Sequence, residues 1–145
     1  MLDLVLAIAH HLLIFGMFGM LCGELILLRQ GIDTSTVARI ARMDIGYGAT
    51  ATLIVIIGFS RAVFAAKGWR YYEHNGFFWA KIATFAVIGL LSIPPTIAFI
   101  RWRAGKIAPS DAQVAGVRRF MLAEVALFPL LPAFAAAMAR GYGAF

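Results

Sequence analysis

The chain has 145 residues, of which 62% are hydrophobic and only 14% are charged. This composition is too apolar for a water-soluble globular protein and indicates an integral membrane protein. The 13 Lys and Arg residues outnumber the 7 Asp and Glu residues, giving a formal charge of +6. In so apolar a chain we attribute the basic excess to the orientation of membrane spans, so no nucleic-acid partner is expected.

Four apolar runs each supply the ~20 residues that a helix needs to cross ~30 Å of hydrocarbon. They are residues 4–28, 45–66, 77–100 and 120–139. We expect the first run to be retained as a span, because it begins with Asp3 instead of a basic region and contains polar residues. No repeat or long linker divides the chain, which predicts an all-α fold with one domain, residues 1–145, built as a four-helix transmembrane bundle.

Prolines and basic residues refine this expectation. Pro94 and Pro95 in the third run, and Pro129 and Pro132 in the fourth, should kink their helices.

The loops after the first and third spans, which lie on one side, carry eight basic residues: Arg29, Arg39, Arg42, Arg101, Arg103, Lys106, Arg118 and Arg119. The opposite side has five: Arg61, Lys67, Arg70, Lys81 and Arg140. This asymmetry predicts that both termini lie outside the cytoplasm, which in a bacterial inner membrane is the periplasmic side.

The first span contains two adjacent histidines and a glutamate. At about 100° per residue, His10, Met17 and Glu24 form one stripe along the helix. His11 points about 100° away, toward Phe15 and Phe18. The two histidines therefore cannot face the same partner equally.

Ionisable groups inside spans are costly and tend to face the bundle interior, so each is a candidate functional residue. In one half of the predicted bundle they are nitrogen bases and cations: His10, His11, Arg61 and Lys81. In the other half the polar residues are Glu24, Asp44, Ser92 and Glu124, with Arg29, Arg101, Arg118 and Arg119 at similar depth. We interpret the second set either as ion pairs with these arginines that fix helix register, or as a polar path for protons or cations.

The histidine half is compatible with a metal or haem site. A neutral imidazole of His11 or His10 is a good ligand for haem iron, zinc or copper. Arg61 and Lys81 would neutralise haem propionates, while phenylalanines and Trp79 would form the walls. The alternatives are that a histidine is merely interfacial and that the two cations extend toward the headgroups.

Motifs for other chemistries are missing from the sequence. It has no HExxH, no CxxC, no phosphate-binding glycine loop and no Ser-His-Asp nucleophile context. Cys22 is the single cysteine and is expected to be a small buried residue. Hydrolase and kinase functions are therefore excluded, and no catalytic residue is assigned.

The segments "AHHLLIFGMFG", "GELILLR" and "FFWAKIATFAVIGLLSIPPTIAFIRWR" resemble a bacterial family of four-span membrane proteins known only as a domain of unknown function. More distantly, the pattern is similar to the copper-resistance-D-like group, which includes the haem-b membrane protoporphyrinogen IX oxidase. That resemblance implies a haem site with His11 as the matching histidine and Lys81 as the matching lysine. The sequence departs from that group at Glu24 and Arg29, and at Ser92, where the group has a histidine in the same helix, so the resemblance supports haem binding more than that reaction.

We therefore expect a membrane protein of b-type cytochrome character, with haem b ligated by His11 or His10. Its function would be electron transfer or haem-dependent oxidoreduction in the bilayer, with a quinone or a membrane protein as redox partner. The competing hypothesis is a non-redox protein that binds or transports protons or metal, or serves as a subunit of a larger complex. Small-residue faces also suggest self-association as a homo-oligomer.

Overall fold

A computed structural model describes residues 2–64 and 68–145, and these residues are organised as helices. The helices are α1 (Leu2–Leu27), α2 (Thr34–Phe64), α3 (Gly68–Glu73), α4 (Gly76–Gly105), α5 (Asp111–Leu127) and α6 (Leu130–Ala139). Four segments are long and apolar enough to cross a membrane: α1, α2, α4, and α5 together with α6. The predicted all-α fold with four spans is confirmed.

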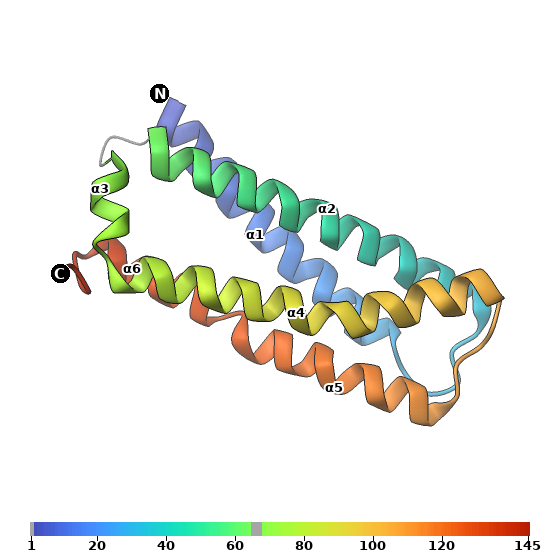
Figure 1. Ribbon diagram of the computed structural model, residues 1–145. Helices are drawn as coiled ribbons and strands as arrows, with labels where there is room; N and C mark the ends of the chain where they lie inside the picture. The colour runs from blue at the N-terminus through green and yellow to red at the C-terminus, as the bar shows by residue number, and fades with distance from the viewer. Residues whose placement is uncertain (1, 65–67) are drawn as a thin grey trace.

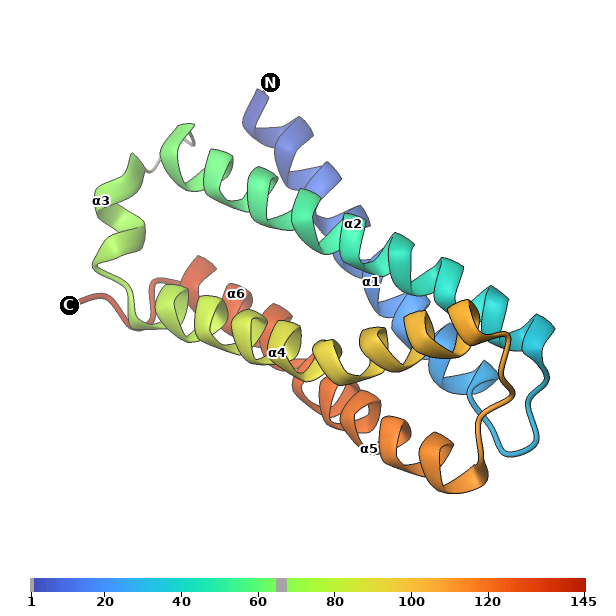
Figure 2. The same ribbon diagram turned by 45° about the vertical axis from the view of Figure 1, so that its right-hand side comes forward.

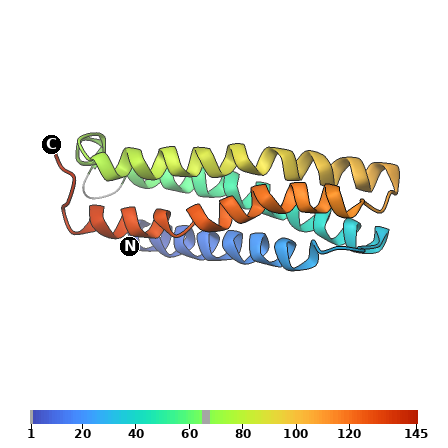
Figure 3. The ribbon, with the colours of Figure 1, turned by 90° about the horizontal axis from the view of Figure 1, so that it is seen from below.

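The helices form an up-and-down bundle (Figure 1). Helix α1 packs beside α2, α2 beside α4, α4 beside α5 and α6, and α5 beside α1. Figure 3 shows both termini at one end of the bundle, and the loops that follow α1 and α4 at the other end. Of the eight basic residues that the sequence assigns to these loops, only Arg29 and Lys106 lie between helices, and the other six lie in the adjoining parts of α2, α4 and α5. We call the two loops together with these adjoining helix turns the arginine-rich loops. They share one end, while the side of the membrane on which they lie stays a prediction.

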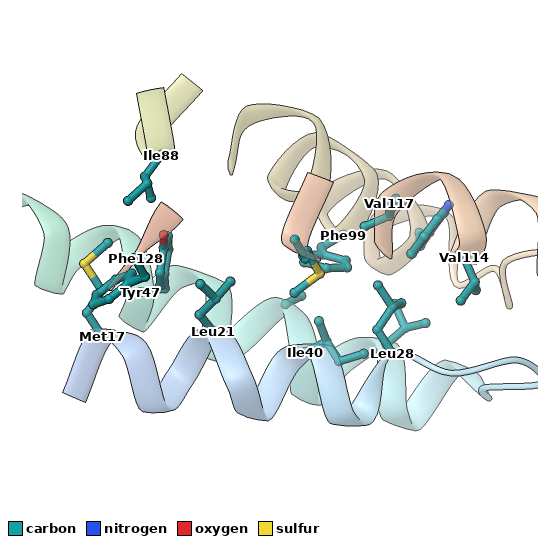
Figure 4. Packing of buried hydrophobic residues seen from close by; sticks show 14 of the residues in the cluster. Met17, Leu21, Leu28, Ile40, Tyr47, Ile88, Phe99, Val114, Val117 and Phe128 are labelled. Carbon is teal, nitrogen blue, oxygen red and sulfur yellow. The ribbon is translucent and has the colours of Figure 1, made fainter. Parts of the chain in front are cut away.

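Burial follows a spacing of alternately three and four residues. Along α1 and the residue that follows it, the inward residues are His10, Met17, Leu21, Glu24 and Leu28. Along α5, the turn after it and α6, they are Val114, Val117, Met121, Glu124, Phe128 and Leu131. This is the spacing of knobs-into-holes packing between nearly antiparallel helices. Figure 4 shows the apolar part of this core, with Met17, Leu21 and Leu28 projecting from α1 toward the other helices. The predicted stripe of His10, Met17 and Glu24 is buried along its length.

Two span boundaries differ from the prediction. Helix α2 begins at Thr34, not at residue 45, because Asp33 caps it and no proline or helix break follows; Asp33 Oδ1 accepts a hydrogen bond from Thr36 N at 2.9 Å. Helix α2 is described as far as Phe64, so residues 65 and 66 of the predicted span, and Lys67, lie outside the described residues. The fourth span begins at Asp111, not at residue 120, because Ser110 and Gln113 form a capping box there.

The two proline pairs act differently. Helix α4 continues through Pro94 and Pro95 and changes direction in its middle part (Figure 1). The fourth span is interrupted at Pro129, which follows the end of α5 at Leu127 and precedes α6. A proline lacks the N–H that would continue the helix, and here the interruption separates α5 from α6.

Asn75 connects the start of α4 to the end of the chain. Its side chain is fully buried, and Oδ1 accepts hydrogen bonds from Phe77 N at 3.0 Å and Phe78 N at 3.3 Å. Its Nδ2 donates to Tyr142 O at 3.0 Å, and the neighbouring Gly76 N donates to Gly143 O at 2.8 Å. The C-terminal residues are thereby held against the junction of α3 and α4.

Replacing Asn75 tests this connection. Asn75→Ala removes a helix cap and leaves a buried carbonyl without its donor, so the free energy of unfolding in detergent should fall by about 1–3 kcal/mol. Asn75→Asp keeps the acceptor but loses the amide donor, and it should retain the cap while releasing Tyr142. Unfolding curves that match the wild type for both variants would contradict this role.

The cap at Asp33 predicts a pH dependence. Hydrogen bonds from Thr36 and then Ser35 lower the pKa of Asp33 from 3.8 to about 2. Because the pKa is lower in the folded state, the stabilisation is fully present above pH 3.8 and is lost as the pH falls toward 2. The difference in unfolding midpoint between wild type and Asp33→Ala should be constant near neutral pH and shrink in strong acid. A difference that grows in acid is the contrary result.

Candidate functional site

The bundle opens at the end that carries the termini. Figure 2 shows α1 and α2 diverging there from α4 and α6. A cavity of about 730 Å³ lies between these helices, with residues of α1, α2, α3, α4 and α6 in its walls. Its volume is within the range of roughly 300–1,000 Å³ that small-molecule and cofactor sites occupy.

His10 lies in the wall of this cavity. Its side chain is 4% exposed, and its Nδ1 has no hydrogen-bond partner within the described part of the chain. Gly58 of α2 makes room for the ring, because a Cβ at that position would lie 3.3 Å from His10 Cε1. A buried imidazole nitrogen without a partner is costly, and a ligand that binds it would offset this cost.

His11 lines the same cavity but is exposed, and its Nδ1 lies 2.6 Å from Ala7 O. The two imidazole rings are 6.3 Å apart at 87°. The sequence favours His11 as the ligand, whereas burial favours His10, because His10 lies on the stripe through which α1 packs against the bundle.

Arg61 of α2 and Lys81 of α4 also line the cavity. Both are half-buried and both interact electrostatically with His10. Trp79 is placed elsewhere: it is 47% exposed, does not line the cavity, and donates from Nε1 to Glu73 O at 3.0 Å. Its neighbour Phe78 is buried and lines the cavity instead, and the role of Trp79 in a cofactor site stays a prediction.

Most of the cavity wall is apolar. It includes four phenylalanine rings from two helices, α1 and α4, and from the turn before α6: Phe15, Phe18, Phe78 and Phe128. A second hollow of about 270 Å³ adjoins it and shares His10, Gly58 and Lys81. Because Phe15, Val55 and Phe59 are exposed on the apolar surface of their spans, the two hollows reach the lipid-facing side of the bundle.

A second set of buried polar residues lies farther from the end with the termini, toward the arginine-rich loops. Glu24, Asp44 and Glu124 are 2%, 7% and 1% exposed, and Glu24 interacts electrostatically with the other two. Tyr47 donates from its hydroxyl to Glu124 Oε2 at 2.9 Å, and Thr96 donates to Asp44 Oδ1 at 2.9 Å. We call Glu24, Asp44 and Glu124 the carboxyl cluster.

The predicted ion pairs with arginines are wrong. Among the described residues, none of the three carboxyl groups forms a salt bridge with an arginine. Arg118 instead donates from Nη1 to Leu25 O at 2.7 Å and to Leu28 O, where it satisfies carbonyl groups at the end of α1. Ser92 lies outside the cluster as well, because its hydroxyl donates to Gly89 O in its own helix at 2.7 Å.

The sequence reasoning missed Thr96 and did not recognise the role of Tyr47. Tyr47 lies three residues after Asp44, on the same helix face, and a tyrosine there could have been proposed as a donor. Thr96 lies one turn after Ser92 on the same face of α4, so the periodicity that singled out Ser92 also points to Thr96.

The two sites have different chemical capacities. The cavity offers an imidazole nitrogen, two cations and aromatic walls, which suit a large apolar ligand with anionic groups. The carboxyl cluster offers oxygen atoms and proton donors, but no group of three His, Cys, Asp or Glu among the described residues is arranged to hold a metal ion.

Comparison with known proteins supports the assignment of the chain as a membrane protein. The chain belongs to the family described as predicted membrane protein DUF2214, whose model matches residues 2–143. No curated protein and no solved structure matches it. The resemblance to the copper-resistance-D-like group therefore stays a prediction.

The hydrogen bond between Tyr47 and Glu124 yields a stability prediction. Tyr47→Phe leaves Glu124 Oε2 buried without its donor, so the free energy of unfolding should fall by about 1–3 kcal/mol. The double variant Tyr47→Phe with Glu124→Met removes both polar partners and should recover part of that loss. Tyr142→Phe, at an exposed tyrosine, is the matched control. A Tyr47→Phe variant as stable as the control would show that the bond contributes nothing.

Proposed function

We propose that this DUF2214 protein is a membrane haem protein of b-type cytochrome character, with haem b held in the cavity between α1, α2, α4 and α6. The observation that carries the proposal is His10 Nδ1, a buried imidazole nitrogen without a partner within the described part of the chain, in the wall of a cavity of about 730 Å³. The function would be electron transfer or oxidoreduction within the bilayer.

The surrounding residues fit this cofactor. His10, or His11 in its place, would provide an imidazole ligand to iron. Arg61 and Lys81, from two different helices, would neutralise the propionates. Phe15, Phe18 and other aromatic side chains would exclude water from the macrocycle. Haem, when bound, supplies a one-electron couple, and the protein residues set its position and dielectric surroundings.

The position of the cavity supports a redox partner within the membrane. Its walls reach the apolar surface through Phe15, Val55 and Phe59, so a lipid-soluble quinone could approach from the bilayer without crossing an aqueous phase. A second membrane protein docked on this face would serve the same purpose. In either case electrons would enter or leave through the lipid-facing side.

Absorption spectroscopy of the detergent-purified protein tests the proposal. After expression with sufficient haem supply, a Soret band and a change on reduction by dithionite are expected. His10→Ala should abolish the band, whereas His11→Ala should preserve it if burial decides the ligand. His74→Ala is a control, because His74 is exposed and does not line the cavity.

The Soret bands of the variants distinguish His10 from His11 as the ligand and test the haem function itself. A band lost only in His11→Ala would support the assignment from sequence instead of the one from burial. A band that survives in both single variants and in the double variant would place haem elsewhere. Absence of any band, in the wild type after haem supply and after reconstitution with added haem, would overturn the haem function.

A non-redox binding function is the second candidate, and the lateral opening of the cavity favours it. The same aromatic walls and the cations Arg61 and Lys81 would accept a lipid-soluble anion without a metal. Such a ligand would depend on both cations but not on an imidazole nitrogen. Retention of a co-purified lipid-soluble anion in His10→Ala, and its loss in the Arg61→Gln/Lys81→Gln double variant, would distinguish this function from haem binding.

A further inference from the structure

The carboxyl cluster does not line the cavity and has no part in the proposed haem site. Glu24 follows His10 by fourteen residues on α1, which corresponds to about 21 Å along a helix. Between the two sites lies an apolar layer formed by Met17, Ile54, Ile88 and Phe128, each no more than 5% exposed. The cluster therefore requires an explanation of its own.

Charge is the first part of that explanation. The cluster brings together one carboxyl group each from α1, α2 and α5, and the charged groups that surround it provide no salt bridge among the described residues. Arg118 on α5 is directed to the carbonyl groups of α1, and Tyr47 and Thr96 contribute neutral donors. Three ionised carboxylates in this position would be strongly unfavourable, and each bound proton removes one of the charges.

An unpartnered oxygen is the second part. Glu24 is 2% exposed, and its Oε1 has no hydrogen-bond partner among the described residues. Because Glu24 interacts electrostatically with both other carboxyl groups, this oxygen belongs to the same site. A proton shared with a neighbouring carboxyl oxygen would satisfy it, whereas the geometry required for a metal ion is missing there.

An access route is the third part. A hollow of about 280 Å³ lies between α2 and α4, and Asp44 forms part of its wall. Arg103 and Ala104, which are both exposed, line the same hollow near the end with the arginine-rich loops. Water in this hollow would reach Asp44, while the apolar layer separates the cluster from the cavity at the other end.

We infer that Glu24, Asp44 and Glu124 form a proton-binding site that exchanges with water at the arginine-loop end through the hollow beside Asp44. Uptake transfers one proton from water to an ionised carboxylate of the cluster, and release returns it to water, without any change of oxidation state. The inference is independent of whether the cavity holds haem. It assigns to the protein a proton site open to one side of the membrane.

Labelling with dicyclohexylcarbodiimide tests whether the cluster holds a proton. This apolar reagent adds to a protonated carboxyl group, takes up its proton and rearranges to a stable N-acylurea. Peptide mass spectrometry at neutral pH should locate the label on Glu24 or Glu124 and leave the exposed Asp33 and Asp111 unlabelled. Glu24→Gln and Glu124→Gln should each remove the label at the substituted position.

Two results would overturn the proton site. One is an absence of label on all three cluster residues in the folded protein, together with full labelling after unfolding in acid. The other is protection by sodium ions at constant ionic strength, which would indicate a bound cation in place of the proton. Labelling that falls as the pH rises and is insensitive to sodium is the expected result.

Infrared spectroscopy tests the route. Transfer into D₂O shifts the carbonyl stretch of a protonated carboxyl group, and the rate of this shift measures access to the cluster. Ala104→Trp narrows the hollow and should slow the shift several-fold, whereas Ala115→Trp, on the exposed face of α5, should leave it unchanged. Equal rates in the two variants would exclude the hollow as the route, and an unshifted band in the wild type would exclude exchange altogether.

Discussion

The buried stripe of α1 is the constraint on which the rest of the structure depends. In a bilayer a helix satisfies its backbone internally, so the positions of its polar side chains decide which face can point to lipid. His10 and Glu24 are fourteen residues apart and lie on the same stripe as Met17, Leu21 and Leu28. Packing this stripe inward places an imidazole at one end of the bundle interior and a carboxyl group at the other.

The neighbouring helices pack differently around those two groups. Beside His10, α2 has Gly58, which carries no side chain and leaves room for the imidazole ring. The divergence of the helices there leaves a cavity with two cations in its walls. Beside Glu24, the helices stay close and supply two further carboxyl groups with neutral donors. One end therefore leaves a cavity of about 730 Å³ and the other brings three carboxyl groups together, although both depend on the same helix face.

Much of the fold could be predicted from the sequence, because span length and the seven-residue spacing on α1 are local properties. The continuity of the helices and the pairing of charges could not. Helix α2 runs without a break from its cap at Asp33 into the span, whereas α5 and α6 are separated at Pro129. The arginines at similar depth suggested ion pairs, but Arg118 satisfies the carbonyl groups that end α1, and depth alone cannot distinguish these two partners.

The separation of the two sites constrains any coupling between them. Met17, Ile54, Ile88 and Phe128 are buried between the cavity and the carboxyl cluster, and a proton cannot cross a dry apolar layer without polar side chains or water. Electrons are not restricted in this way over short distances, and the charge of the cluster would act across the layer through the low dielectric of the interior. Influence between the two ends would therefore be electrostatic: a proton gained at the cluster would change the potential at the cavity without itself reaching it.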